Sequence, residues 1–282
     1  MALRNVAVFG GNGFIGGYLV KLLQETPELK VRVIYNKSSP KFRFKNVKYI
    51  KFSSKENLLD QCDLVIILTQ PNLELIKYIQ DYSQDIKRII FGSTLLLYKD
   101  SLRKHSEESE VNPITDYEKQ KAKEETLLIQ FVRKQNKLLT IARIGNVYGD
   151  VKNLGIVQKI VSATYNKLPF SVNNSGDQIR DYIFVEDVAK YLKFLIINNQ
   201  EFQVEIFNIC SGRGYSINEL ISEVEKTGQI KLKRIEGVEM LEKKSIVGDN
   251  GKIIKAAGFL PEYSLESGLK KTFENFLRKE SL

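Results

Sequence analysis

The chain has 282 residues, of which 43% are hydrophobic and 27% are charged. This length suffices for one large domain or two small ones, and this composition excludes a disordered chain. No apolar run approaches the roughly 20 residues that a membrane-spanning helix needs. The opening segment "MALRNVAVFG" lacks the apolar core and cleavage site of a signal peptide, so we expect a cytoplasmic protein.

The cysteine and histidine content and the net charge exclude further classes of protein. The two cysteines, Cys62 and Cys210, border apolar runs, so we expect buried thiols rather than a disulfide framework. A single histidine, His105, gives no basis for a histidine metal site or a Ser-His-Asp triad, and we expect no metal. The net charge of +9 is spread over interspersed Lys and Glu, and no nucleic-acid-binding motif is present. We therefore expect neither nucleic acid nor a membrane as a partner.

Apolar runs and helical patterns alternate along the first two thirds of the chain. In chain order we predict strand 6–9, a helix beginning near Phe14, strand 31–35, strand 64–68, helix 73–82, strand 88–91, helix 117–134, strand 139–144, helix 185–197 and strand 204–209. This alternation predicts an α/β fold with a doubly wound parallel sheet, and the continuous apolar strands indicate helices on both faces. We expect residues 1–153, with 183–210 returning to them, to form the sheet domain. A smaller, interleaved lobe would contain 154–182 and 211–282.

The stretch "VAVFGGNGFIGGYLVKLLQ" places a glycine turn between the first strand and the first helix. Gly10 would permit the tight turn, Gly13 the approach of a pyrophosphate and Gly16 close packing of the helix on the strand. The helix N-terminus favours a negative charge there. A purely structural glycine turn is the alternative, but the strand-turn-helix context favours a dinucleotide site. Its predicted cofactor-binding residues are Gly10, Asn12, Gly13, Phe14, Ile15 and Gly16.

The end of the second strand bears on which dinucleotide is bound. An acidic residue there is typical of NAD sites, whereas basic or small polar residues accommodate the 2′-phosphate of NADP. Tyr35, Asn36, Lys37 and Ser38 include no acid. We therefore expect NADP(H), contacted by Asn36 and Lys37, with NAD(H) as the alternative. Lys37 could equally be a solvated lysine of a basic protein.

Tyr117 and Lys121 lie four residues apart on a predicted helix, so both project from one face. An ammonium beside a phenol stabilises the phenolate and lowers its pKa, which would make the pair an acid/base unit. The spacing alone is weak evidence, since it recurs at Tyr148 and Lys152. Upstream, Ser93 and Thr94 end a strand at the sheet edge where ligands bind, and a hydroxyl there could hold a carbonyl oxygen.

Together these residues resemble the extended short-chain dehydrogenases/reductases of the nucleotide-sugar epimerase, dehydratase and reductase group. The resemblance spans nearly the whole chain and includes the glycine turn, "GST" followed by "LY", and the Tyr and Lys pair. It continues through "ARIGNVYGD", "GDQIRDYIFVEDVAKYL" and "IFNICSGRGYSINEL". The resemblance implies a nucleotide-sugar substrate, bound by the smaller lobe.

The resemblance also implies roles for particular residues. Thr94 falls at the catalytic Ser or Thr, Tyr117 at the general acid/base, and Lys121 at the lysine that lowers the tyrosine pKa and binds the nicotinamide ribose. Thr69 falls in the loop on the nicotinamide side. The implied substrate-binding residues are Thr94, Asn146, Asn153, Leu154, Phe170 and Arg180, of which Arg180 would contact the diphosphate. Alternatives are an ion pair of Arg180 with Asp177 or Asp181, and a turn role for Asn146.

Some positions depart from the family pattern. "LTQPN" replaces an Ala-Ala pair, Ser53 or Ser54 replaces an aspartate near the adenine, and a second phosphate-binding arginine is absent, with Lys243 or Lys244 as substitutes. "STLLLY" lacks the Asp-Glu pair of the dehydratases, which argues against a 4,6-dehydratase. We expect an NADPH-dependent reductase of an NDP-4-keto-6-deoxy sugar that forms a homodimer. The alternatives are an NAD-dependent NDP-hexose 4-epimerase and a non-catalytic NADP-binding sensor.

Overall fold

The computed structural model describes residues 4–36, 43–150, 155–198 and 202–280. The chain divides into two compact units, which are described separately. The first contains residues 1–94, 115–143 and 189–207, and the second contains residues 95–114, 144–188 and 208–282. Both units are therefore assembled from three separate stretches of the sequence.

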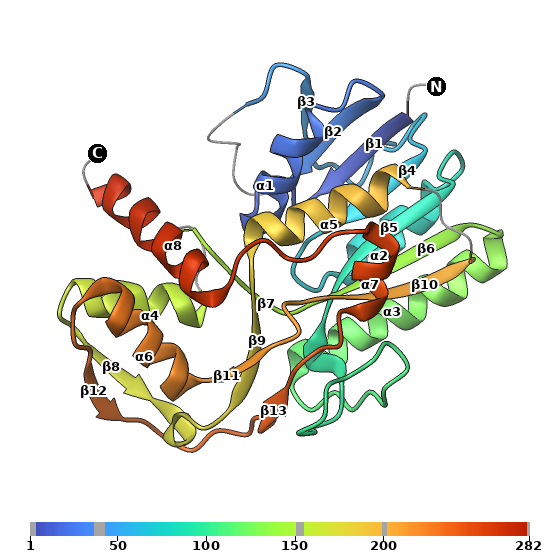
Figure 1. The fold of residues 1–282 in the computed structure, drawn as a ribbon. Coiled ribbons are helices and arrows are strands. Elements are labelled where there is room, and N and C mark those ends of the chain that lie inside the picture. The colour runs from blue at the N-terminus through green and yellow to red at the C-terminus, as the bar shows by residue number, and fades with distance from the viewer. Residues whose placement is uncertain (1–3, 37–42, 151–154, 199–201, 281–282) are drawn as a thin grey trace. The chain divides into compact units, whose positions relative to one another are not determined.

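A seven-stranded sheet in the order β10-β6-β5-β4-β1-β2-β3 forms the centre of the first unit (Figure 1). Neighbouring strands from β3 to β5 pair in parallel; for example, Val6 of β1 is aligned with Val31 of β2 and Leu64 of β4. The strands are β1 (Arg4–Phe9), β2 (Leu29–Tyr35), β3 (Val47–Lys51), β4 (Leu64–Ile67), β5 (Arg88–Thr94), β6 (Leu138–Ile144) and β10 (Val204–Ile209). The doubly wound parallel sheet expected from the sequence is confirmed.

Helices cover both faces of this sheet. α2 (Leu73–Asp81) and α3 (Asp116–Gln135) pack on one face, where Ile79 and Leu128 join Phe9, Ile67 and Phe91 in a single buried cluster. The alternate strand residues, such as Val8 and Ile66, are fully buried on the opposite face. Figure 1 shows α1 (Phe14–Leu23) and α5 (Val185–Ile197) on that side. Burial on both faces explains why these strands read as continuous apolar runs.

The strand β3 was not predicted, and its place in the sheet gives the reason. It lies at the edge, and its sequence alternates apolar residues with Lys48 and Lys51, both of which are exposed. An edge strand has less surface to bury, and lysine there discourages pairing with another chain. A search for continuous apolar runs therefore passes over it.

The described residues of the second unit form two small sheets, four α-helices and two short 3-10 helices. One sheet has the order β11-β9-β13, with β7 also paired to β9, and the other pairs β12 with β8. Its elements are η1 (Leu95–Leu97), β7 (Asn146–Tyr148), α4 (Ile156–Tyr165), β8 (Pro169–Val172), η2 (Asn173–Gly176), β9 (Ile179–Phe184), β11 (Gly214–Ser216), α6 (Ile217–Gly228), β12 (Lys233–Glu236), β13 (Ser245–Ile246), α7 (Gly251–Ala257) and α8 (Leu265–Glu280). Residues of α4, α6, α8, β7 and β9 share one core cluster.

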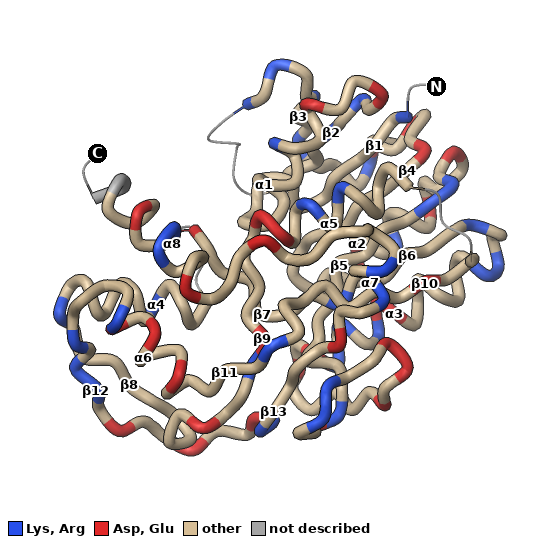
Figure 2. Tube along the Cα trace, viewed as in Figure 1, with Lys and Arg blue, Asp and Glu red and all other residues tan. Residues whose placement is uncertain are grey.

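The thiols agree with the expectation from composition, and the charge agrees with it only in part. Lys and Arg are interspersed with Asp and Glu along most of the trace (Figure 2). Residues 29–55 are the exception, since they include nine Lys or Arg residues and no Asp or Glu. Cys62 and Cys210 are both buried and free, which confirms the prediction of buried thiols. Among the described residues, no helix is long and apolar enough to cross a membrane.

The turn between β1 and α1 is packed closely around two glycines. Gly10 has φ +81°, and a Cβ built on it would lie 2.5 Å from the carbonyl oxygen of Leu68. A Cβ on Gly16 would lie 2.1 Å from the carbonyl oxygen of Gly10. No side chain could replace either hydrogen atom without moving backbone. The predicted tight turn and close helix packing are therefore present.

Gly16 and Gly17 offer a matched pair of substitutions on α1. Gly16→Ala should lower the free energy of unfolding by about 1–3 kcal/mol, because the new methyl group overlaps the Gly10 carbonyl. Gly17→Ala should leave it unchanged or raise it by up to ~1 kcal/mol, since nothing lies within 4 Å of its Cβ position and alanine favours a helix. Denaturant unfolding of both variants tests this. Equal effects would contradict the packing described here.

A buried acidic side chain, Asp181, makes the stability of the second unit depend on pH. Asp181 of β9 is 1% exposed and accepts hydrogen bonds from Ser211 N (2.8 Å), Ser211 Oγ (2.7 Å) and Gly212 N (3.0 Å). Burial raises the pKa of Asp181 from 3.8 to about 6, although these hydrogen bonds oppose the shift. The folded protein therefore holds this proton more tightly than the unfolded chain.

The free energy of unfolding should accordingly contain a component that falls as pH rises from about 4 to about 6. Its size should be up to about 3 kcal/mol, because the folded pKa lies above the unfolded one and ionisation is disfavoured only in the fold. Asp181→Asn cannot ionise and should lack this component. Denaturant unfolding of both proteins at successive pH values measures the difference, and a difference independent of pH would contradict the assignment.

Candidate functional site

The turn after β1 leads into a helix whose first amide groups lack a side-chain cap. The N-cap residue of α1 is Gly13, which supplies no side-chain hydrogen bond, and no acidic residue lies in the first turn. Gly13 N donates to Gly10 O (2.9 Å), which closes the turn. Asn12, Phe14 and Ile15 are partly buried around it. Uncapped N–H groups and the helix dipole favour an anion, so these residues fit the pyrophosphate of a dinucleotide.

The end of β2 has no carboxylate among the described residues. Tyr35 is partly buried and Asn36 is exposed, and Lys37 lies outside the described residues. The adjacent strand continues the edge, since Phe52 N donates to Tyr35 O (2.7 Å). The described part of this strand end therefore retains the small polar character on which the cofactor prediction depends.

The hydroxyl residues at the end of β5 are both buried. Thr94 is 7% exposed and Ser93 is 6% exposed. The Ser93 Oγ atom has no hydrogen-bond partner among the described residues. The two side chains point to opposite faces of the sheet because strand residues alternate, which places Ser93 on the same face as Phe91. The strand end thus presents one hydroxyl group on each face.

Helix α3 begins where the sequence predicts it and places Tyr117 in its first turn. Thr115 is the N-cap residue, and its Oγ1 atom accepts a hydrogen bond from Glu118 N (3.3 Å). Tyr117 is 38% exposed, and its hydroxyl makes no hydrogen bond among the described residues. The phenol of Tyr117 is therefore accessible, rather than committed to the core.

The pKa of Tyr117 does not behave as the pair alone would suggest. It is raised above 10, first because part of the side chain is desolvated, and then because Glu124 and Glu118 repel a phenolate. The sequence argument expected the Lys121 ammonium to lower this pKa. That expectation is wrong, because desolvation and the two carboxylates raise the pKa.

Lys121 is buried one helical turn from Tyr117. Its side chain is 3% exposed, and the Nζ atom donates to Thr69 O (3.2 Å) after β4 and to Gly92 O (3.1 Å) within β5. The ammonium also lies 4.4 Å from the centroid of the Phe91 ring. Thr69, predicted to contact a cofactor, therefore contacts the predicted catalytic lysine through its backbone.

Two carboxylates of α3 bind the cations of this region, and neither was predicted. Glu124 Oε2 lies 3.2 Å from Lys121 Nζ. Glu125 binds Arg143 of β6 through two hydrogen bonds, Nε to Oε1 (3.2 Å) and Nη2 to Oε2 (2.7 Å). Arg143 lies inside the quoted stretch "ARIGNVYGD", but its partner could be identified only once the helix had been packed against the sheet.

The predicted substrate-binding residues of the second unit are only partly accessible. Asn146 begins β7 opposite Tyr182, so it belongs to a strand and not to the turn weighed as an alternative. Phe170 of β8 packs against the core cluster of this unit. Asn153 and Leu154 lie outside the described residues. The substrate-binding roles of these four residues remain predictions.

Arg180 of β9 is 4% exposed and already has an anionic partner. Its Nη2 atom donates to Glu242 Oε1 (2.7 Å), and its Nη1 atom donates to Ile179 O (2.8 Å). The sequence alternatives for this ion pair were Asp177 and Asp181, and neither is the partner, since Asp181 is bound to Ser211 and Gly212. Lys243, a suggested substitute for a second arginine, is buried and donates to Leu96 O.

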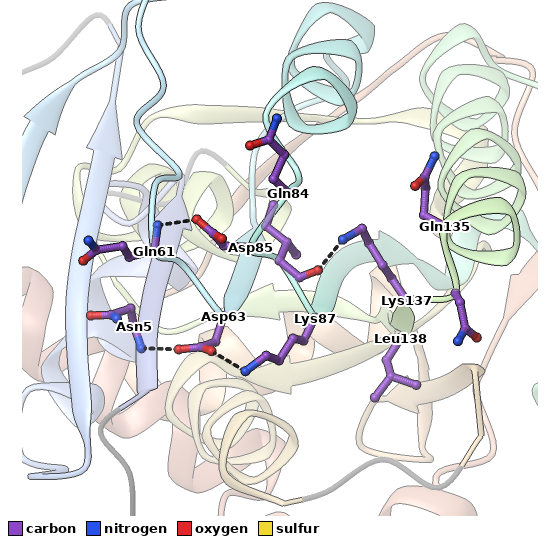
Figure 3. A pocket seen from close by; sticks show the side chains of 11 residues that line it. Asn5, Gln61, Asp63, Gln84, Asp85, Lys87, Gln135, Lys137 and Leu138 are labelled. Carbon is purple, nitrogen blue, oxygen red and sulfur yellow. Dashed lines mark hydrogen bonds and ion pairs between the residues drawn. The ribbon is translucent and has the colours of Figure 1, made fainter.

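A cavity of about 650 Å³ lies elsewhere in the first unit (Figure 3). Asn5, Asp63, Lys87 and Leu138, which line it, are at the amino ends of β1, β4, β5 and β6. Asp63 accepts from Asn5 N (3.0 Å) and Lys87 Nζ (3.0 Å), so its charge is satisfied. Gly10 and Thr94 end strands at the opposite edge. This cavity is therefore separate from the candidate site.

The chain is similar to several proteins of known activity. The UDP-glucuronate 4-epimerase of Thermodesulfobacterium geofontis is 25% identical over 204 residues, covering 71% of this chain and 62% of the relative. The dTDP-4-dehydro-6-deoxyglucose reductase of Escherichia coli is 25% identical over 202 residues, covering 69% and 63%. The matches thus span less than two thirds of each relative.

Solved structures show the same fold. The crystal structure of UDP-glucose 4-epimerase from Thermotoga maritima with UDP-glucose superposes with a TM-score of 0.87 at 24% identity, covering 98% of this chain and all of that one. A sequence model of the NAD dependent epimerase/dehydratase family matches residues 69–210, which include Thr94, Tyr117, Lys121 and Arg180. The chain belongs to the NAD dependent epimerase/dehydratase family.

Proposed function

We propose that this protein transfers hydride between a nicotinamide dinucleotide and C4 of a nucleotide-linked sugar, with Tyr117 exchanging a proton with the oxygen on that carbon. The observation that carries the proposal is the placing of Tyr117 one turn from Lys121, whose ammonium is anchored at Thr69 and Gly92. β1, β4 and β5 are neighbours in the sheet, so the glycine turn and this pair share one sheet edge. Ligands of parallel α/β sheets bind at that edge.

Each candidate site residue of the first unit then has a proposed chemical role. The glycine turn and the start of α1, whose N-cap Gly13 has no side-chain cap, would hold the pyrophosphate of a dinucleotide, which would supply hydride-transfer chemistry when bound. Thr94 supplies a hydroxyl to the sugar oxygen at the end of β5. Tyr117 is the proton donor in reduction and the acceptor in oxidation, and Lys121 provides the positive charge near it.

The nucleotide sugar is proposed from the relatives, whose names specify nucleotide-linked sugars. Arg180 is the residue that would bind the diphosphate, since its planar guanidinium can donate two parallel hydrogen bonds to phosphate oxygens. Glu242 Oε1 accepts a hydrogen bond from the Nη2 atom of Arg180. A bound diphosphate would therefore have to displace this carboxylate, which is exposed enough to move away.

Within this function, a reductase using NADPH is the first candidate. The described end of β2 contains Tyr35 and Asn36 and no carboxylate to hold the ribose hydroxyls of NAD. Similarity to the dTDP-4-dehydro-6-deoxyglucose reductase is consistent with this candidate. An NAD-dependent 4-epimerase is the second candidate, favoured by the family description and by the similarity to the UDP-glucuronate 4-epimerase. A non-catalytic sensor would have no need for Thr94, Tyr117 and Lys121 together.

Cofactor retention and turnover separate the candidates. The purified protein is denatured and the supernatant is assayed for released dinucleotide. Tightly held NAD, with interconversion of UDP-glucuronate or UDP-glucose epimers, would support the epimerase. A protein that is purified empty and oxidises NADPH with dTDP-4-dehydro-6-deoxyglucose would support the reductase. Gel filtration at several concentrations tests the homodimer that we also propose.

Tyr117→Phe should lower kcat/KM at least about 100-fold, because it removes the proton donor while keeping the ring. The dissociation constant of the dinucleotide should stay within about twofold, since the pyrophosphate site is on α1. Tyr82→Phe is the matched control, because its ring packs on Tyr78 in the core and its loss of a hydroxyl should leave turnover unchanged. Near-normal turnover of Tyr117→Phe would show that another group is the acid.

Glu242→Gln should tighten the binding of UDP by about two- to fivefold, because an ion pair whose carboxylate is 36% exposed contributes ~1 kcal/mol or less to holding Arg180. Arg180→Met should abolish this binding. Glu239→Gln, an exposed residue of the same segment, is the control and should have no effect. Titration calorimetry with UDP gives the affinities, and unchanged binding in Arg180→Met would remove Arg180 from the site.

A further inference from the structure

Glu124 is a buried carboxylate in α3 to which the proposed chemistry assigns no task. It is 1% exposed. Its Oε1 atom accepts a hydrogen bond from Asn72 N (2.6 Å) at the start of α2, and its Oε2 atom lies 3.2 Å from Lys121 Nζ. A buried carboxylate is costly unless a cation and hydrogen bonds compensate it. Lys121 is that cation, so the two residues depend on each other.

The Lys121 ammonium is held by two hydrogen bonds and one ion pair. Its Nζ atom donates to Thr69 O and Gly92 O, and Glu124 Oε2 lies 3.2 Å away as the counter-charge, without a hydrogen bond of its own among the described residues. The Tyr117 hydroxyl is not among these partners. The position of the charge is therefore determined by two strand ends and by Glu124.

Two other carboxylates of α3 also act on Tyr117 or Lys121. Glu118 lies next to Tyr117 on α3 and raises its pKa, as Glu124 does. Glu125 also acts on Lys121, but its two oxygens are bound to Arg143. Glu124 is thus the carboxylate that acts on both Tyr117 and Lys121 without an arginine partner.

We propose that Glu124 is a positioning residue, which holds the Lys121 ammonium at the ends of β4 and β5 and sets the pH range in which Tyr117 exchanges its proton. This inference rests on the proposed role of Tyr117 as the acid/base. It assigns to the site a counter-charge that stabilises the protonated forms of both neighbours. The protein would thereby keep a neutral phenol and a charged lysine together in a poorly solvated place.

The direction of the effect follows from Coulomb attraction alone. Removing one negative charge makes protons leave both neighbouring groups more easily, so the pKa values of Tyr117 and Lys121 should both fall. Sugar reduction needs the protonated phenol, so its loss of activity on raising the pH should begin at a lower pH. Oxidation needs the phenolate, so its gain of activity on raising the pH should also begin at a lower pH. Both pH profiles should therefore shift in the same direction.

A purely structural role is the competing explanation, because Glu124 also joins α3 to the first turn of α2. Glu124→Gln separates the two roles, since the amide oxygen can still accept from Asn72 N while the charge is gone. Asn72→Ala is the matched control. It removes the side chain that caps α2 through Leu75 N (3.1 Å), but it leaves the charge of Glu124 in place.

The first experiment needs no substrate. The near-ultraviolet absorbance of the phenolate is followed against pH in proteins with and without Tyr117→Phe, and the difference isolates the titration of Tyr117. In Glu124→Gln its midpoint should fall by about one pH unit relative to the wild type. In Asn72→Ala it should not move, even if the melting temperature falls. An unchanged midpoint in a folded Glu124→Gln protein would overturn the inference.

The second experiment separates this inference from the proposed function. The pH profile of kcat/KM is measured for wild type, Glu124→Gln and Glu124→Asp with NADPH and dTDP-4-dehydro-6-deoxyglucose, or with UDP-glucuronate. The limb should shift to lower pH in Glu124→Gln and return towards the wild-type value in Glu124→Asp. A limb that stays in place while Tyr117→Phe abolishes turnover would overturn the role of Glu124 and leave the function intact. A protein in which Tyr117→Phe turns over normally would overturn the function itself.

Discussion

The first unit is organised around one buried ammonium. Lys121 is almost completely removed from water, so it must find oxygens to bind, and it finds them at the ends of two adjacent parallel strands. These contacts fix the register of α3 against the sheet. Because Thr115 begins the helix and Tyr117 follows two residues later, the same register determines where the phenol lies. The position of Tyr117, the candidate acid, thus follows from the two backbone carbonyls that bind the Lys121 ammonium.

Consecutive carboxylates on α3 complete the charge balance. Glu124 compensates Lys121 within the helix, and Glu125 compensates Arg143 of the neighbouring strand β6. Neither pair is exposed, so each charge would be costly without its partner. The two pairs differ in function. The bidentate pair of Glu125 ties the helix to the sheet. Glu124 pairs with Lys121 and accepts from Asn72 N, and it also raises the pKa of Tyr117.

Similar proteins with this fold carry names for different reactions, including 4-epimerases and a reductase. The sheet and its glycine turn bring the proposed dinucleotide site and the proposed acid/base to one edge, and such an arrangement would suit any reaction that begins or ends with hydride transfer. What distinguishes the reactions must lie in the side chains around that edge. In this chain the side chains at that edge include the polar end of β2, the hydroxyls of Ser93 and Thr94 at the end of β5, and the carboxylate of Glu124.

Much of the first unit is determined by short-range features of the sequence. The strands are continuous apolar runs because helices cover both of their faces, and the glycines at 10 and 16 are required by contacts within one turn. The spacing of Tyr117 and Lys121 is enough to put both on one side of a helix. The partners of charged residues were decided only by tertiary structure: Glu242 for Arg180, Arg143 for Glu125, and two backbone carbonyls for Lys121. Sequence spacing describes one element at a time, whereas an ion pair or a pKa depends on groups that different elements bring together and on the water that their packing excludes.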